Sequence, residues 1–406
     1  MERQYKDSGI EWIGRIPREW KTTKLSVLYS QRNEKVSDKD YAPLSVTMQG
    51  VLPQLDTAAK TDDGDNRKLV KKGDFAINSR SDRRGSCGIS PYDGSVSLIN
   101  TILKPRGEMT PNFYNWLFHT SLFADEFYKW GHGIVDDLWT TRWQEMKNIS
   151  VVIPSLDEQQ RIADYLDKKC EEIDSLVELQ EQMIAQLTEY KQSVITEAVT
   201  KGLDPTAPLV PSGIDWIGDI PKGWNMQRLK FLCTIQTGNQ DTQDSDPCGA
   251  YPFYVRSPII ERSNKHSFEG EAILMAGDGA GAGRVFHHVY GKYAVHQRVY
   301  RLANIKEVDS NYLFYFISSL FCKEMDRGSA QSTVPSVRLP MLQNFNICIP
   351  TDGEQIDIVK YLDKKCGEID DLIAMKQKKI ETLKEYKKSV IYEAVTGKTL
   401  IGEGEA

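Results

Sequence analysis

Two long segments, residues 155–202 and 351–397, carry apolar residues at steps of three and four, which predicts two long amphipathic helices. Each segment opens with a capping-box pattern, in which Ser155 or Thr351 stands three residues before a glutamate, and each closes on a glycine. One apolar stripe of this length needs a partner, and we expect each helix to pair with the other along a coiled-coil seam. The predicted seam residues are Ile162, Leu166, Ile173, Leu187, Val194, Ile358, Leu362, Ile369, Leu383 and Val390.

The two helical segments are copies of each other. Aligned from Glu158 and from Glu354, 25 of 43 positions are identical. A shorter element also recurs, since SGIEWIGRIPREW at residues 8–20 returns as SGIDWIGDIPKGW at residues 212–224. The chain is therefore a duplication, and each half contains a tryptophan motif, a middle region and a long helix. We interpret the motif as a packing element that docks apolar side chains.

The two middle regions share a plan but little sequence. We expect strands at residues 74–78, 96–103 and 149–153 with a helix over 110–130 in the first half, and strands at 272–276, 293–302 and 345–349 with a helix over 309–325 in the second. Residues 284–302 alternate as a β-hairpin does. The predicted fold class is α/β (α+β), with mixed sheets and helices in an internal pseudo-twofold repeat.

The net charge of −6 disfavours a uniformly basic nucleic-acid binder, but the charge is unevenly spread. Residues 67–106 hold nine Lys and Arg against three acids, and residues 251–301 hold seven against four. No apolar run approaches membrane-spanning length and the start lacks a signal-peptide core, so a cytoplasmic location is expected. The seven cysteines form no C-x-x-C pair, which disfavours a zinc ribbon or a disulfide framework.

Two loops carry residues suited to nucleic acid. Residues 78–85 hold three arginines among serines, and arginine can bind phosphate or guanine with two hydrogen bonds. The glycine-rich residues 277–283 resemble a dinucleotide loop, but no helix pattern follows them, as that mechanism requires. The open alternatives are a solvated charged loop for 78–85, and either close backbone approach to a nucleic acid or a structural turn for 277–283.

None of the patterns in the sequence that resemble a catalytic or metal site is complete. The P-loop-like ending near Lys398 lacks its glycine, because position 392 is tyrosine. His287, His288 and His296 have no carboxylates or cysteines in metal-binding order, and no methyltransferase tetrapeptide occurs. We therefore expect neither catalytic residues nor a metal site in this chain.

The repeated SGIxWIGxIPxxW motif, the P-x-x-x-EQ sequence before each helix, the I-x-x-YLD run and the SVIxEAVT tail cover nearly the whole chain. In these features the sequence resembles the DNA-specificity subunits of type I restriction-modification systems. The resemblance implies two target recognition domains, each reading half of an interrupted DNA site, separated by two antiparallel helices that dock methyltransferase subunits. The implied domains are residues 1–154, a central helix at 155–202, a linker and second domain at 203–350, a C-terminal helix at 351–398 and a tail at 399–406.

The resemblance also sets the expected partners: double-stranded DNA, two methyltransferase subunits and, through the complex, restriction subunits. S-adenosylmethionine, ATP and Mg are expected in the partner subunits and no cofactor in this chain. A subunit of a methylation-only system, and a two-module protein scaffold that does not bind DNA, are the alternatives. Candidate DNA contacts in the first half are Asn78, Ser79, Arg80, Arg83, Arg84, Thr140, Thr141 and Arg142. In the second half they are Asn239, Gln240, Arg256, Ser257, Arg262, Lys265, Arg284, Gln297, Arg298, Gln331 and Ser332.

Overall fold

The structure is a computed structural model that describes residues 3–54, 64–133, 139–328 and 335–402. The chain divides into two compact units. Unit 1 comprises residues 1–180 and 378–406, and unit 2 comprises residues 181–377. Each long helix therefore contributes one end to each unit.

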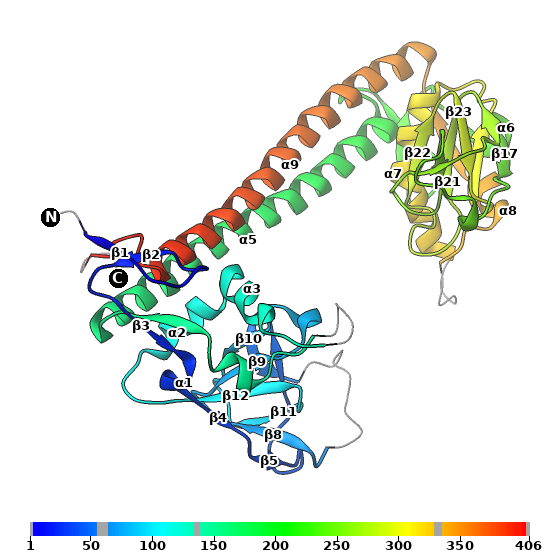
Figure 1. Cartoon of the computed structure of the whole chain (residues 1–406). Coiled ribbons are helices and arrows are strands. Elements are labelled where there is room, and N and C mark those ends of the chain that lie inside the picture. The colour runs from blue at the N-terminus through cyan, green and yellow to red at the C-terminus, as the bar shows by residue number, and fades with distance from the viewer. Residues whose placement is uncertain (1–2, 55–63, 134–138, 329–334, 403–406) are drawn as a thin grey trace. The chain divides into compact units, whose positions relative to one another are not determined.

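The two predicted long helices are present as α5 (Leu156–Lys201) and α9 (Asp352–Val395) (Figure 1). In unit 1 the start of α5 lies against the end of α9, where Lys387 Nζ is 2.7 Å from an Asp174 carboxylate oxygen. In unit 2 the end of α5 lies against the start of α9, where Lys191 Nζ is 2.7 Å from Asp370. The pairing is antiparallel in both units, and the two ion pairs occupy the same positions of the repeat.

The seam is buried where it joins the core of a unit. Seven predicted seam residues are buried: Ile162, Leu166, Ile173, Val194, Ile358, Leu362 and Ile369. Leu187, Leu383 and Val390 are half-buried. Several apolar residues of the same helices, including Leu176 and Leu372, are exposed, because two paired helices cover only one stripe of each other.

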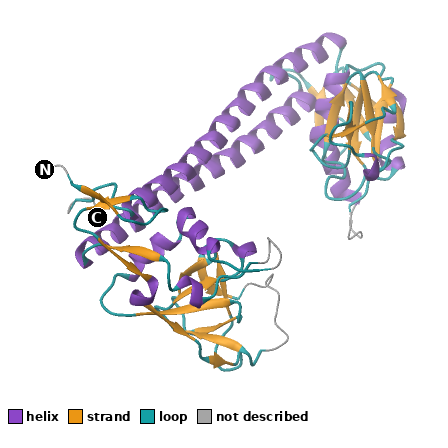
Figure 2. Cartoon of the chain, in the orientation of Figure 1, coloured by secondary structure: helices purple, strands orange, loops and turns teal. Residues whose placement is uncertain are grey.

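Each unit is built on a four-stranded antiparallel sheet of its own. Its order is β10-β9-β12-β4 in unit 1 and β22-β21-β24-β17 in unit 2. Strand pairs β3–β13 and β1–β2 in unit 1 correspond to β16–β25 and β14–β15 in unit 2. This arrangement of sheets and helices agrees with the predicted mixed α and β fold class. Figure 2 shows strands and helices in each unit.

The strands of unit 1 are β1 (Tyr5–Asp7), β2 (Arg15–Pro17), β3 (Lys21–Lys24), β4 (Tyr29–Arg32), β5 (Lys35–Val36), β6 (Leu44–Thr47), β7 (Gly50–Pro53), β8 (Arg67–Val70), β9 (Phe75–Asn78), β10 (Cys87–Ile89), β11 (Gly94–Val96), β12 (Asn100–Pro105) and β13 (Ser150–Ile153). Its shorter helices are α1 (Leu25–Leu28), α2 (Pro111–Phe118), α3 (Ser121–Lys129) and α4 (Trp143–Met146).

The strands of unit 2 are β14 (Leu209–Pro211), β15 (Asp219–Pro221), β16 (Asn225–Arg228), β17 (Thr234–Thr237), β18 (Tyr251–Tyr254), β19 (Glu261–Ser263), β20 (Phe268–Glu269), β21 (Ala272–Ala276), β22 (Phe286–Val289), β23 (Lys292–Val295), β24 (Val299–Ala303) and β25 (Asn346–Ile349). Its shorter helices are α6 (Leu229–Leu232), α7 (Ser310–Gly328) and α8 (Leu339–Gln343).

Alternation along the central strands sorts side chains into two layers. Phe75 and Ile77 of β9 pack with α2 and the long helices, while Ala76 faces a second small core with Val70 and Val96. In unit 2, Ile273 and Met275 of β21 face α7 in the same way. The layer on the other face differs: β11-β8-β5 and β6-β7 in unit 1, and β19-β18-β23-β20 in unit 2.

Four predicted elements were wrong in detail. The helix expected over 110–130 is two helices, because the Thr120 hydroxyl accepts a hydrogen bond from Phe123 N (3.2 Å) and caps a new helix. The strands expected over 96–103 and 293–302 are each interrupted. The hairpin expected over 284–302 does not form, since β22 pairs with β21 while β23 pairs with β18 and β20 in another sheet.

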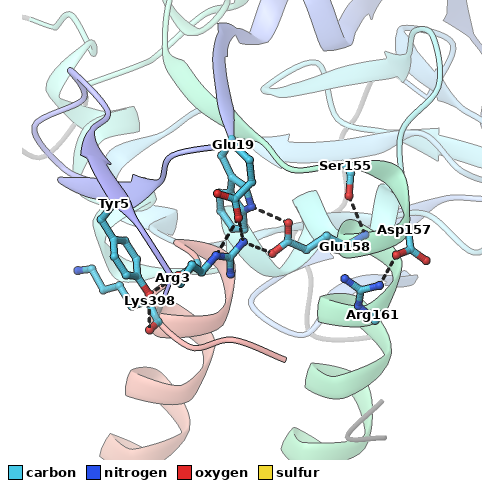
Figure 3. Close-up of polar contacts among 10 residues, drawn as sticks. Arg3, Tyr5, Glu19, Ser155, Asp157, Glu158, Arg161 and Lys398 are labelled. Carbon is cyan, nitrogen blue, oxygen red and sulfur yellow. Dashed lines mark hydrogen bonds and ion pairs between the residues drawn. The ribbon is translucent and has the colours of Figure 1, made fainter. Parts of the chain in front are cut away.

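The tryptophan motif fastens the start of one long helix to the end of the other. In unit 1, buried Trp20 donates from Nε1 to Glu158 Oε2 (2.7 Å). Arg3 Nη2 lies 2.5 Å from the other carboxylate oxygen of Glu158 (Figure 3). The Trp20 ring also lies against Gly397, beyond the end of α9, where an added Cβ would be 2.9 Å from it. Gly397 has φ +71°, so both space and backbone favour glycine there.

Unit 2 repeats the arrangement. Trp224 donates from Nε1 to Glu354 Oε1 (3.3 Å) and lies against Gly202 at the end of α5. Burial acts to raise the pKa of Glu354, but hydrogen bonds from Thr351 and Trp224 outweigh it and lower the pKa overall. The stabilisation from this carboxylate is therefore present above its ordinary pKa and is lost as the pH falls through the lowered value.

The glutamine after each of these glutamates joins the start of the long helix to the residue that precedes α2 in unit 1 and α7 in unit 2. Gln159, 2% exposed, donates to Pro154 O (3.0 Å) and accepts from Thr110 N (2.9 Å), just before α2. Gln355 donates to Pro350 O (3.0 Å) and accepts from Asp309 N (2.7 Å), just before α7. The repeated P-x-x-x-EQ sequence is thus a structural joint, present once in each unit.

Replacing Trp20 by Phe should lower the free energy of unfolding by about 2 kcal/mol, because a nearly buried carboxylate loses a charge-assisted hydrogen bond while ring packing is largely kept. Trp116→Phe is the matched control, since Trp116 donates to the exposed carboxylate of Asp167 (2.8 Å), and it should cost less than about 1 kcal/mol. Urea unfolding of the full chain measures both. Equal losses would show that the Trp20 bond is no stronger than a surface bond.

Candidate nucleic-acid interface

In unit 1 the arginine-rich loop leaves the central strand β9 and is held by a second loop from near α4. Thr141 N donates to Ser79 O (2.9 Å), and Arg80 and Thr140 form an antiparallel bridge. Asn78 Oδ1 accepts from Arg80 N (3.1 Å), which turns the chain into a short 3₁₀ helix, η1 (Ser81–Arg83). Residues 78–84 and 139–142, distant in sequence, therefore form one surface.

The three arginines of this loop are matched with acids. Asp82 lies between Arg80 (Nε to Oδ1, 3.1 Å) and Arg83 (Nε to Oδ2, 3.8 Å). Arg84 pairs with Asp125 and lies 5.5 Å from the centre of the Tyr128 ring. Exposed ion pairs of this kind contribute about 0–1 kcal/mol, so a stronger anion can replace the carboxylate at little cost.

A cleft of about 390 Å³ opens beside the loop. It is lined by Gln31, Lys68, Ser79, Leu98, Ile99, Thr101, Thr140, Arg142 and Trp143. Lys68 Nζ donates to Asn100 O (2.6 Å), and burial lowers the pKa of Lys68. Sequence reasoning missed Lys68 and Gln31 as site residues, although Lys68 lies in the basic stretch; only the fold brings β4 and β8 to this loop.

Two candidate residues of unit 1 lie beneath the surface. Ser79 is 3% exposed, with its hydroxyl 2.9 Å from that of Thr101, and Thr141 is fully buried and donates from Oγ1 to Phe127 O (2.9 Å). Both hydroxyls are satisfied inside the protein. In this structure these residues shape the loop, while Arg80, Arg83, Arg84 and Arg142 reach solvent.

In unit 2 the glycine-rich turn follows the corresponding strand, β21, and leads into β22. Asp278 lies between Arg256 (Nη1 to Oδ1, 3.1 Å) and Arg298 (Nε to Oδ2, 3.7 Å), as Asp82 does between two arginines of unit 1. The turn, Arg256, Ser257 and Asp278 line a cleft of about 630 Å³. Ser257 shapes its rim, because its hydroxyl accepts from Ile259 N (3.1 Å).

His296 anchors a second loop to this cleft. It is 3% exposed, its Nδ1 accepts from Arg298 N (3.0 Å), and its Nε2 lies 3.4 Å from Asp241 Oδ1. Gln297 also donates to Asp241, from Nε2 to Oδ2 (3.0 Å), and Gln240 forms a parallel bridge with His296. The histidine therefore positions residues 239–242 against 297–298.

The remaining candidates of unit 2 lie around a neighbouring cleft or apart from both. Asn239, Gln240 and Lys265 line a cleft of about 660 Å³. Arg262 supports its edge, donating to Gly249 O (2.7 Å) and Ala250 O (2.9 Å). Arg284 instead lies 3.7 Å from Asp326 of α7. Gln331 and Ser332 lie outside the described residues.

One exposed arginine was missed by sequence reasoning. Val337 N donates to Gly277 O (2.8 Å) and Ser336 bridges Asp278, which places Arg338 beside the glycine-rich turn. The signal was available: the shift of 196 positions that aligns Glu158 with Glu354 also aligns Arg142 with Arg338.

Within the described ranges, no group of three or more His, Cys, Asp or Glu residues could hold a metal ion. In the same part of the chain, no helix has the length and apolar character needed to cross a membrane.

Residues 221–385 match the family described as type I restriction modification DNA specificity domain. The match covers most of unit 2 and the first part of α9, and the resemblance inferred from the repeated motifs is confirmed.

Curated relatives agree. The chain is 23% identical over 421 residues to the type I restriction enzyme MjaVIII specificity subunit of Methanocaldococcus jannaschii, covering 95% of this chain and 94% of that protein. It is 25% identical over 180 residues to the type I restriction enzyme EcoDI specificity subunit of Escherichia coli, covering 44% of this chain and 39% of that protein.

Solved structures share the fold. A chain from a structure reported as the structural basis of complex assembly and conformational transition of the type I R-M system matches with a TM-score of 0.72 at 15% identity, covering 95% of this chain and 99% of that one. The HsdS subunit from Thermoanaerobacter tengcongensis matches with a TM-score of 0.50 at 16% identity, covering 95% and 98%.

Replacing Asp278 by Asn should strengthen binding to a polyanion, because Arg256 and Arg298 lose their shared carboxylate. The protein should elute from immobilised heparin at a higher salt concentration than the wild type. Asp204→Asn is the control, because it also removes one exposed negative charge. Asp204 lies in the linker, and its carboxylate accepts a hydrogen bond from Thr206 and not from an arginine. Equal shifts for both variants would show that only net charge matters.

Proposed function

We propose that this chain is the sequence-specific DNA-binding subunit of a type I restriction-modification enzyme. Each unit reads one half of a bipartite DNA target, and the paired helices set the gap between the halves and dock methyltransferase subunits. The observation that carries the proposal is the duplication itself: one sheet order and one helix joint occur twice and support two different loop surfaces rich in arginine. The specificity-domain match to residues 221–385 supports the choice of DNA as ligand.

The two surfaces differ as two half-sites of unlike sequence require. At corresponding bridge positions unit 1 has Arg80 and unit 2 has Asp278. Arginine donates to guanine or phosphate, whereas a carboxylate accepts from the amino group of cytosine and repels phosphate. Glycine-rich backbone near Asp278 allows close approach to a base edge.

We propose no chemical step for this chain. S-adenosylmethionine, ATP and Mg are assigned to partner subunits: two methyltransferase subunits docked on this chain, and restriction subunits joined through the complex.

A binding selection tests the proposal. The chain, reconstituted with its methyltransferase subunit, is incubated with random-sequence duplex DNA, and bound DNA is sequenced. Two short conserved blocks separated by a fixed unread gap are expected, with methylation inside them only when the partner is present. Absence of any enriched sequence would support the protein-scaffold alternative, and methylation by the chain alone would overturn the division of labour. A complex that methylates but never recruits a restriction subunit would indicate a methylation-only system.

Replacing Arg83 and Arg84 together by alanine should weaken DNA binding, and the slope of log K against log salt should become shallower by about 0.9 for each lost phosphate contact. If either arginine reads a base, specificity at one position of one half-site should relax by about 1–3 kcal/mol. Arg256→Ala with Arg298→Ala makes the same test on the other half-site. Affinity and salt slope that match the wild type in both pairs would leave these loops as solvated surface.

Lengthening both helices should lengthen the unread gap. Four residues inserted near Gln180, with a matching insertion near Lys376, add about 6 Å of helix, and base pairs rise about 3.4 Å. The gap should therefore grow by one or two base pairs while both half-sites stay unchanged. Mapping of methylated sites before and after insertion measures this, and altered half-sites at a constant gap would contradict it.

A further inference from the structure

Arg142 and Arg338 occupy the same position in the two units. Each follows a residue whose N–H donates to the loop leaving the central strand: Thr141 N to Ser79 O (2.9 Å) and Val337 N to Gly277 O (2.8 Å). Thr141 and Val337 are buried (0% and 5% exposed), so the backbone just before each arginine is fixed. The shift of 196 positions is the one that relates the long helices.

The short helices that follow are also alike. α4 begins directly after Arg142 and α8 directly after Arg338. Beyond them, Asn148 Nδ2 donates to Gln144 O (3.0 Å) and Asn344 Nδ2 donates to Pro340 O (2.8 Å). This asparagine is shared for a structural reason, because its amide closes the turn in both units.

No internal partner accounts for the shared arginine. Both residues are exposed, and within the described ranges neither guanidinium group makes a hydrogen bond or an ion pair. The other candidate arginines form ion pairs with Asp82, Asp125, Asp278 or Asp326, and Arg262 donates hydrogen bonds to backbone carbonyls. Arg142 and Arg338 are thus presented free beside each reading loop.

The neighbouring positions differ sharply between the units. By their backbone contacts, Ser79 corresponds to Gly277 and Arg80 to Asp278, a reversal of charge. A surface that reads bases must change when the target sequence changes. An exposed residue that stays the same on two divergent surfaces is suited to a ligand common to both half-sites, which is the sugar-phosphate backbone.

We infer that Arg142 and Arg338 each bind a backbone phosphate of their own half-site and set the register of the reading loop, without reading sequence. The inference rests on the proposed function and assigns these two residues a role distinct from that of their neighbours. Arginine suits the role because its planar group donates two parallel hydrogen bonds to phosphate oxygens and stays charged at all relevant pH values.

Alanine variants of the full chain, assembled with the methyltransferase subunit, test the inference on selected target DNA. Arg142→Ala and Arg338→Ala should each lower affinity about tenfold, equally for target and non-target DNA, so that the specificity ratio is unchanged. The salt slope should fall by about 0.9 per substitution. Arg15→Ala is the matched control. Arg15 is an exposed arginine on β2, and the aligned position in the second copy of the motif is Asp219, so the position does not need an arginine in both units. Affinity should stay near wild type.

Neutral methylphosphonate substitution, one phosphate at a time, locates the contact. One phosphate in each half-site should weaken wild-type binding, and the corresponding arginine variant should show no further loss there. A changed base preference would assign the arginine to base reading and overturn the inference, as would wild-type affinity and slope in both variants. If the wild-type complex itself selects no sequence, the proposed function fails; if it does and the variants match it, only this inference fails.

Discussion

The hydrogen bond from a buried tryptophan to the glutamate in the first turn of a long helix is the contact on which each unit depends. Trp20 and Glu158 form it in unit 1, and Trp224 and Glu354 form it in unit 2. The same ring covers the glycine at which the other long helix ends. A single side chain therefore joins an incoming helix, an outgoing helix and the start of a folded unit, which explains why the tryptophans of the motif recur while the middle regions diverge.

That joint separates the parts that stabilise each unit from the loops that differ between the units. The conserved parts of the repeat lie at the joint: the motif, Gln159 and Gln355, and the antiparallel ion pairs Lys387–Asp174 and Lys191–Asp370. The divergent parts lie at the ends of the central strands, where loops carry little of the core. Loops can change there without loss of the fold, because the buried surface that stabilises each unit lies on the sheet face towards the helices.

Both loop surfaces keep their arginines close to a carboxylate. Asp82 and Asp278 each lie between two arginines, at nitrogen-to-oxygen distances of 3.1–3.8 Å. Such an arrangement holds the guanidinium groups in place at small cost, and it limits attraction to any polyanion. Under the proposed function, it favours DNA that offers a base donor or a well-placed phosphate over DNA that offers charge alone.

The duplication, the two long helices and the repeated motifs could be predicted from the sequence, because they rest on local periodicity and on identity at a fixed shift. The arginine loop and the glycine turn could be located in the same way. Which of their side chains meet depends on the folded arrangement of distant segments. Lys68 joins Arg142 across one cleft, His296 holds the loop at Asp241, and Ser79 and Thr141 turn inward, because β-sheet pairing brings distant segments together through contacts that no local pattern encodes. The separate sheets of β22 and β23 have the same cause, since strand pairing across the unit overrides the local alternation there. The helix break at Thr120 is local instead, because the Thr120 hydroxyl caps α3.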